Sequence, residues 1–178
     1  MYCEDSEGTD IDHHRPKSAF PEHCFRWPNY LLACSHCNSN EKRTQYPLDS
    51  RGQPFLLDPS VDDPYAHIAF VPELGRFEGV TKRGKRTVKV FGLNRRENLE
   101  IGRRDTWTVM SALLRDYARA RTAHDVRWQS RVKEAIQDLS FQSVVQPFIR
   151  DALNGQETVA PSVSALVKAT QEEWEWAL

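Results

Sequence analysis

An aspartate and two histidines stand side by side near the start of the chain, and basic residues follow them closely. The stretch IDHHRPKSAF places Asp12, His13 and His14 directly before Arg15, with Lys17 two positions further on. Imidazole and carboxylate groups together suit general-base chemistry or metal binding, and neighbouring cations suit a phosphate. These residue types therefore suit a metal site or a general base next to a bound phosphate.

A second group of polar residues follows in the stretch WPNYLLACSHCNSNEKR. Cys34 and Cys37 have the C-x-x-C spacing that suits one face of a tetrahedral Zn²⁺ site. Asn38 comes directly after the second cysteine, and Asn29 lies five residues before the first. All four cysteines lie within the first 37 residues, so metal binding explains them better than disulfides in a reducing compartment.

In this order and spacing the residues resemble the HNH endonucleases, which carry a ββα-metal finger. That family has a C-x-x-C knuckle, then D-H-x-x-P, then an Asn five residues before a second C-x-x-C that is followed by Asn or His. The matching residues here are Asp12, His13, Pro16, Asn29, Cys34, Cys37 and Asn38. The resemblance covers residues 1–46 and implies a metal-dependent DNA endonuclease that leaves 5′-phosphate and 3′-hydroxyl ends.

Phosphodiester hydrolysis needs an activated water, a cation that stabilises developing charge, and a rigid frame. His13 can accept a proton near pH 7, so we expect it to be the general base. Asp12 and Asn38 offer oxygen ligands for one catalytic Mg²⁺ or Mn²⁺. The resemblance implies that the Asn29 side chain braces the loop that carries the base.

We expect Lys42 to act in catalysis through contact with the phosphate, and four further residues to bind the substrate: His14, Arg15, Lys17 and Arg43. Lys42 shares a helix face with Asn38, although the family's lysine more often lies where this chain has Glu41. His14 could instead be structural, because the D-H-x-x-P pattern counts from His13. An Asp-His-His triplet also occurs in DHH phosphoesterases, which need further Asp motifs and a larger α/β domain that this sequence does not show.

The resemblance also implies a structural Zn²⁺ bound by Cys3, Cys34 and Cys37. The set has a gap, because Cys3 matches the second cysteine of the first knuckle and the position of its first cysteine would precede Met1. Either the chain begins inside its own motif, or another residue completes the site. Candidates for that ligand are Cys24, His23 and His36. Cys24 also has an ordinary interpretation as a half-buried thiol.

We predict an α+β fold with three parts: the finger and zinc knuckle at 1–50, a hairpin and short helix at 51–94, and a helical scaffold at 95–178. PFLLDP, HIAFVP and FEGV have the short apolar pieces of strands and a hairpin. Thr81 is expected to cap a helix that ends near Gly92.

In the C-terminal half, apolar residues recur at helical spacing. One stripe comprises Leu99, Trp107, Met110, Leu113, Leu114 and Tyr117, and predicts a long helix. A second segment runs from Val132 to Ile149, where we expect Pro147 to bend or restart it. A last helix is expected to carry Trp174. We predict that Trp107, Trp128 and Trp174 lie in the core and that Trp27 is more open. The C-terminal helix, with Trp174 and Trp176 among glutamates, could equally dock a partner.

The chain has 24 Lys and Arg against 25 Asp and Glu, which gives a net charge of −1. A polyanion must therefore be held by a local basic patch or with the help of a partner. The run TKRGKR and the pairs Arg95, Arg96 and Arg103, Arg104 could follow a DNA backbone, although such runs are usually solvated faces. No apolar run approaches the about 20 residues that cross a bilayer and no signal peptide is visible, so we expect a cytoplasmic protein.

The segment LLDPSVDDP, the hairpin and the helix ending in FGLNR resemble a narrower group of HNH proteins. These stand beside an ATPase in anti-phage defence systems of the Septu type and in some retron systems. The resemblance implies an ABC-like or SMC-like ATPase partner that restrains or activates the nuclease, and DNA in preference to RNA as substrate. Two other functions stay open: a non-catalytic zinc-knuckle binding module, and a regulatory subunit whose nuclease site is inactive.

Overall fold

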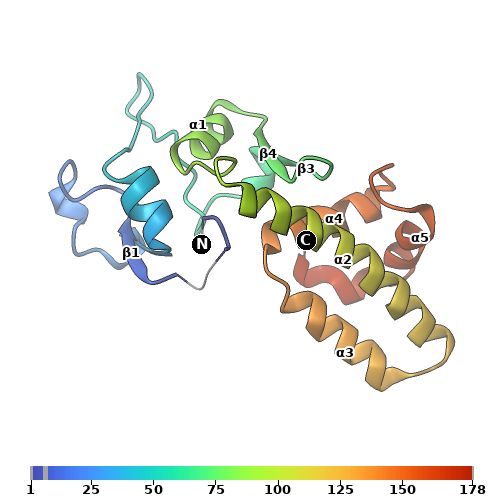
Figure 1. Cartoon of the computed structure of the whole chain (residues 1–178). Helices are drawn as coiled ribbons and strands as arrows, with labels where there is room; N and C mark the ends of the chain where they lie inside the picture. Colours follow the sequence, from blue (N-terminus) through green and yellow to red (C-terminus); the bar gives the residue numbers. More distant parts are fainter. Residues whose placement is uncertain (1, 6–7, 178) are drawn as a thin grey trace. The chain divides into compact units, whose positions relative to one another are not determined.

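The computed structural model describes residues 2–5 and 8–177 and has an α+β fold (Figure 1). The chain divides into two compact units. The first comprises Met1–Val71 and Arg76–Glu100, and the second comprises Pro72–Gly75 and Ile101–Leu178.

The first unit begins with an antiparallel hairpin of β1 (Asp10–His13) and β2 (Tyr30–Ala33). Asp12 lies opposite Leu31, and His13 lies opposite Tyr30. Two 3-10 turns, η1 (Pro21–His23) and η2 (Trp27–Asn29), lie in the connection between the strands, and the π-helix η3 (His36–Lys42) follows β2. Side chains alternate along a strand, so Asp10 and Asp12 share one face of β1 while Ile11 and His13 share the other.

The rest of the first unit contains η4 (Pro64–Ala66), the hairpin of β3 (Ile68–Val71) and β4 (Arg76–Gly79), and α1 (Lys82–Val90). This confirms the predicted hairpin and the helix capped by Thr81, whose Oγ1 accepts from Gly84 N at 3.1 Å. The left-handed Gly92, with φ of 57°, follows its end. Leu56, Phe77, Val90, Phe91 and Leu93 form the core of these elements.

PFLLDP, predicted as a strand, is a buried loop instead. Its only strand-like contact among the described residues is an isolated bridge between Leu48 and Pro54. Proline cannot donate to a ladder, so Pro54 and Pro59 disfavour a strand on both sides of Leu57. The Leu57 N–H instead donates to Thr87 Oγ1 of α1 at 3.0 Å, which satisfies its buried backbone group.

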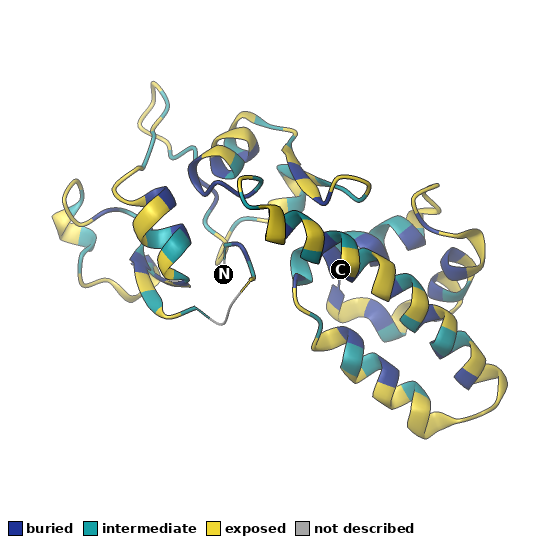
Figure 2. Cartoon of the chain, in the orientation of Figure 1, coloured by how far each residue is buried: buried dark blue, intermediate teal, exposed yellow. Residues whose placement is uncertain are grey.

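The second unit is helical and contains most of the long α2 (Glu97–Thr122). Its other elements are α3 (Val126–Gln137), α4 (Gln142–Asn154), α5 (Pro161–Ala169) and the 3-10 segment η5 (Gln171–Ala177). The predicted stripe is confirmed, because Met110, Leu114 and Tyr117 are fully buried. They belong to one apolar core shared by all five elements, visible as dark blue patches in Figure 2.

Three details of this half differ from the sequence predictions. The predicted helical segment is interrupted at Phe141 and not at Pro147. Phe141 has a left-handed backbone (φ of 60°) and directly precedes α4, and Pro147 lies inside that helix. The last predicted helix is divided, since α5 ends at Ala169 and Trp174 lies in η5. Trp128 is exposed because its indole N–H reaches Asp116 at 2.6 Å on the outside of the helices.

The other tryptophans lie as predicted. Trp174 is fully buried with its ring edge against Tyr117, while Trp107 packs at the border of the same core against Phe148. Trp27 is exposed. None of the described helices combines the length and the apolar character that crossing a membrane requires.

Candidate functional site

Asp12 lies in the interior of the first unit and is surrounded by hydrogen-bond donors. Only 2% of it is exposed, and Lys42, with which it pairs, is completely buried. The Lys42 ammonium donates to Asp12 Oδ1 and to the His13 carbonyl, each at 2.8 Å. The Tyr2 hydroxyl donates to Asp12 Oδ2 at 2.6 Å. Burial lowers the pKa of Lys42, although the Asp12 charge opposes this effect. Burial, and then the charge of Asp12, raise the pKa of Tyr2.

Asn38 lies on the same side of β1 as Asp12, but its amide contacts a different carboxylate. Asn38 Nδ2 donates to Asp10 Oδ2 at 3.3 Å. Sequence reasoning did not identify Asp10. The alternation of strand side chains could have found it, because a residue two positions before Asp12 must share its face.

The π-helical form of η3 explains how Lys42 reaches Asp12. Arg43 N donates to Asn38 O at 2.7 Å, a five-residue step that widens the turn. The wider turn accommodates the extra residue between Asn38 and Lys42. Glu41, at the family's more common lysine position, instead forms an ion pair with Arg95 and lies within hydrogen-bond distance of His36 Nε2, at 3.3 Å.

The two histidines of the opening stretch have different surroundings. The His13 ring is half-buried, with Nε2 at 3.1 Å from the Cys24 carbonyl and 4.0 Å from Cys24 Sγ. Its edge faces Tyr30, with ring centroids 5.0 Å apart. His14 is buried against Tyr46, and its Nδ1 has no partner in the described part of the chain. Burial lowers the pKa of His14. His14 thus lies inside the unit, and His13 is the more accessible of the two.

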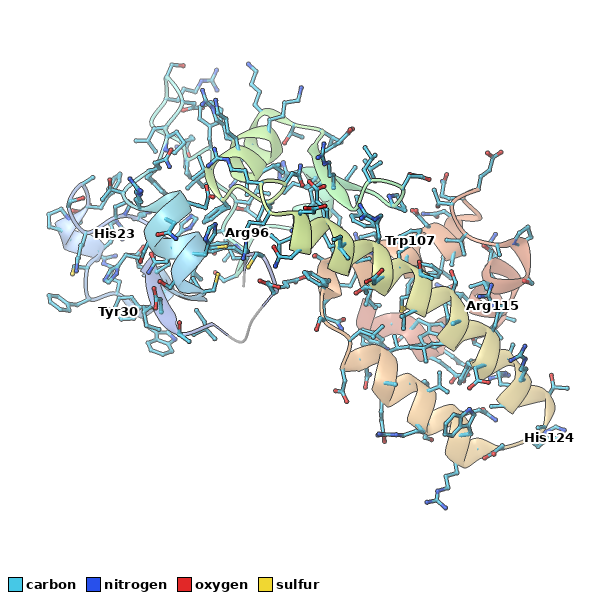
Figure 3. The ribbon with its side chains drawn as sticks, in the orientation of Figure 1. His23, Tyr30, Arg96, Trp107, Arg115 and His124 are labelled. Carbon is cyan, nitrogen blue, oxygen red and sulfur yellow. The ribbon has the colours of Figure 1, made fainter. Side chains whose placement is uncertain are left out.

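Asn29 is buried, and its side chain links separate parts of the connection between β1 and β2 by hydrogen bonds. Its Oδ1 accepts from Arg15 N at 2.7 Å, while its Nδ2 donates to the carbonyls of Arg15 and His23, both at 3.1 Å. The side chain therefore holds the backbone that follows His13 and His14. This connection and β2 carry the labelled His23 and Tyr30 in Figure 3.

The remaining predicted substrate contacts lie at different depths. Arg15 is half-buried, and its guanidinium donates to His23 Nε2 at 2.9 Å. Lys17 and Arg43 are exposed. The two exposed cations are open to an anion, whereas Arg15 already has a partner.

Cys3, Cys34 and Cys37 gather their sulfur atoms within 4.8 Å of one another. The Sγ atoms of Cys3 and Cys34 are 3.6 Å apart. Thiolates bound at about 2.3 Å to a tetrahedral zinc would lie about 3.8 Å apart, so the cluster fits three of its four ligands. The Cys3 pKa lies well below its usual value, chiefly because the Cys37 thiol hydrogen-bonds to it. Arg96, labelled near yellow sulfur atoms in Figure 3, also contacts Cys3.

The other candidate zinc ligands lie elsewhere. Cys24 contacts His13, His23 contacts Arg15, and His36 pairs with Glu41. In the ranges 2–5 and 8–177, no further His, Cys, Asp or Glu joins the three cysteines. The sequence did not predict that Cys24 lies beside His13, because the two residues meet only when the segment between β1 and β2 has folded.

Comparison with known proteins relates the chain to bacterial relatives. It is similar to the Septu protein PtuB. The relative from Bacillus mycoides (strain KBAB4) is 28% identical over 129 residues, which cover 56% of this chain and 44% of that protein. The relative from Bacillus thuringiensis is 33% identical over 104 residues, or 56% of this chain and 38% of that protein. The matches thus span less than half of either relative. No family profile and no solved structure matches the chain.

Proposed function

We propose that the chain is a metal-dependent HNH endonuclease that hydrolyses DNA phosphodiester bonds within an anti-phage defence complex. The observation that carries the nuclease proposal is that β1 holds Asp12 and His13 as neighbours, while Asn38, distant in sequence, contacts Asp10 of the same strand. The similarity to Septu protein PtuB supports the defence role.

In this proposal His13 removes the proton from the attacking water. Its Nε2 lies 3.1 Å from the Cys24 carbonyl, which can only accept a hydrogen bond. The neutral imidazole therefore carries its proton on Nε2, and Nδ1 keeps the lone pair that accepts a proton from water. Asn29 fixes the loop after His13 through its three hydrogen bonds, which keeps the imidazole in place.

The oxygen donors of Asp12 and Asn38, beside the strand that ends at His13, suit a Mg²⁺ or Mn²⁺ ion in their chemistry. Asp12 and Asn38 would hold the ion, with Asp10 as a further donor that already touches Asn38. When bound, the cation would stabilise negative charge on the phosphate and on the leaving oxygen. Asp12 is already bonded to Lys42, so the ion and the ammonium would have to share its carboxylate.

The exposed cations Lys17 and Arg43 would hold the phosphate backbone of the substrate. The half-buried Arg15 would assist them. The net charge of −1 leaves little general attraction to DNA, so a partner that presents the substrate would help. An ABC-like or SMC-like ATPase is the partner that we propose.

The enclosed state of Asp12 favours a second function, a non-catalytic zinc-knuckle module that binds nucleic acid. Both carboxylate oxygens of Asp12 accept hydrogen bonds, and the ion pair with Lys42 could be purely structural. The three-cysteine cluster would serve this function equally well. The two functions differ in whether His13 is needed for cleavage.

The test is cleavage of supercoiled plasmid by the full chain with Mg²⁺ or Mn²⁺, with and without the co-expressed ATPase. We expect His13→Ala to lower the rate at least about 100-fold, the usual minimum for loss of a general base. The matched control is His124→Ala, because His124 is exposed in the second unit. Equal cleavage by both variants, or none by the wild type under any condition, would leave the binding module as the function.

A further inference from the structure

Two large aromatic side chains next to the candidate site are almost fully exposed. Phe25 is 91% exposed and Trp27 is 82% exposed. Arg26, between them, is also exposed. Burying an aromatic side chain normally stabilises a protein, so two neighbouring aromatic side chains exposed to water point to a binding role.

The backbone that carries these side chains is held in place. Arg26 N donates to His23 O at 3.1 Å, and Asn29 N donates to Arg26 O at 2.9 Å. Trp27 opens the turn η2, where Pro28 restricts the chain. The buried amide of Asn29 ends the same turn and bonds to His23 O. The aromatic side chains therefore project from a fixed loop.

Ring contacts connect this loop to the proposed base. The Trp27 ring lies edge-on to Tyr30, with centroids 6.1 Å apart and planes at 72°. Tyr30 in turn lies edge-on to His13, at 5.0 Å and 73°. A ligand on the face of Trp27 would thus lie within two ring contacts of the His13 imidazole.

The charge of the connection matches a polyanion. It carries the cations Arg15, Lys17 and Arg26 and one acid, Glu22, whereas the whole chain has a net charge of −1. Cations between exposed aromatics are typical of surfaces that bind single-stranded nucleic acid, where bases stack and phosphates meet positive charge. A surface for protein docking would not require cations at these positions.

We propose that Phe25 and Trp27 form a platform on which unpaired bases of the substrate stack while the neighbouring phosphate lies at His13. The inference rests on the proposed nuclease function and specifies its substrate class as single-stranded or locally unpaired nucleic acid. A base paired within a duplex cannot offer its face to Trp27 unless the duplex opens. Discrimination therefore depends on base stacking and does not require a particular sequence.

The test measures binding of fluorescent oligonucleotides of about 16 nucleotides to full-length protein, as a single strand and as a duplex of the same sequence. His13→Gln is the background, so that bound strands stay intact. We expect Trp27→Ala to weaken single-strand binding roughly 5- to 150-fold, the range for loss of one stacked base, and to change duplex binding much less. Phe25→Ala should act in the same direction, and Trp27→Phe should retain most of the affinity.

The matched control is Trp128→Ala, because Trp128 is also exposed but lies in the second unit. Equal losses for single strand and duplex, or no loss in either, would overturn the platform. So would a Trp27→Ala protein that binds both normally but no longer associates with the ATPase, since the surface would then dock protein. If plasmid cleavage requires His13 but proceeds at the same rate in Trp27→Ala, the platform is disproved and the nuclease function stands. If single-strand binding depends on Trp27 but no cleavage is found, the nuclease function is disproved and the binding platform stands.

Discussion

The ion pair between Asp12 and Lys42 is the most enclosed charged contact of the candidate site. Its two members are almost completely buried, and the ammonium also donates to the His13 carbonyl. Such a pair stabilises a fold weakly as a unit, yet removing one partner leaves an unpaired charge in the interior. It also fixes the backbone at His13, which links the stability of the site to its proposed chemistry.

We expect Lys42→Met to destabilise the first unit by about 3–5 kcal/mol, because the buried Asp12 side chain would lose the cation that pairs with it. Urea denaturation measures this loss. Lys17→Met is the matched control, since Lys17 is exposed and its replacement should change stability by less than about 0.5 kcal/mol. Adding Asp12→Asn to the Lys42→Met protein should recover part of the stability. Equal urea midpoints for Lys42→Met and Lys17→Met would show that the pair of Asp12 and Lys42 does not stabilise the first unit.

Helix α1 lies so close to strand β4 and to the His67 carbonyl before β3 that only glycine fits at two positions. A Cβ on Gly84 would lie 1.9 Å from the His67 carbonyl oxygen, and one on Gly79 would lie 2.2 Å from Lys85 N. Both obstacles are backbone atoms, which cannot move away as a flexible side chain can. The hairpin and α1 therefore pack through these glycines.

Gly84→Ala should destabilise the protein by about 1–3 kcal/mol despite the higher helix propensity of alanine. The cause is the clash with the His67 carbonyl, which forces α1 away from the hairpin. Thermal denaturation measures the effect. Lys85→Ala, at the exposed neighbouring position of the same helix, should leave stability nearly unchanged. A Gly84→Ala protein as stable as wild type would contradict the close packing.

The basic run TKRGKR supplies α1 with one paired arginine and with several exposed cations. Arg83 pairs with Asp62 and holds the helix to the preceding loop, with its NH2 at 2.6 Å from Asp62 Oδ2. The exposed cations recur at helical spacing along one face and are Lys82, Lys85, Arg86 and Lys89. The exposed face can follow a phosphate backbone, while Arg83 is already engaged.

Removing two charges from this face, with Lys85→Ala and Lys89→Ala together, should weaken DNA binding similarly for all sequences. Each lost phosphate contact should reduce the slope of log affinity against log salt by about one. Binding measured across a salt series tests this. Arg76→Ala is the control, because Arg76 is exposed but pairs with Glu100 at 2.7 Å. An unchanged slope in the double variant would show that the face is only solvated.

The elements that the sequence predicted well are those that local signals determine. The Thr81 cap, the glycine after α1 and the apolar stripe of α2 each act within a few residues. The restart at Phe141 and the outward position of Trp128 depend on packing between helices, which spacing along the chain does not reveal. The same holds at the candidate site. The motif indicated Asp12 and Asn38, but their contacts with Lys42 and Asp10 arise only after η3 has packed on β1.

At the scale of the molecule, each unit has an apolar core of its own. The core of the second unit extends over α2 to η5 and includes the fully buried Trp174. The core of the first unit is smaller and centres on Leu56 and Phe91, and the three clustered cysteines belong to this unit as well. A bound metal would therefore matter more to the first unit than to the second.

We expect the full chain to contain about one zinc ion, and a chelator to lower the unfolding temperature of the first unit without changing that of the second. Metal analysis and calorimetry measure the two effects. Trp174→Ala should do the reverse, since it removes a buried ring from the second core. Cys34→Ser should lose the zinc, whereas Cys24→Ser should keep it because Cys24 lies beside His13. Zinc lost from the Cys24 variant, or retained by the Cys34 variant, would assign the metal to other ligands.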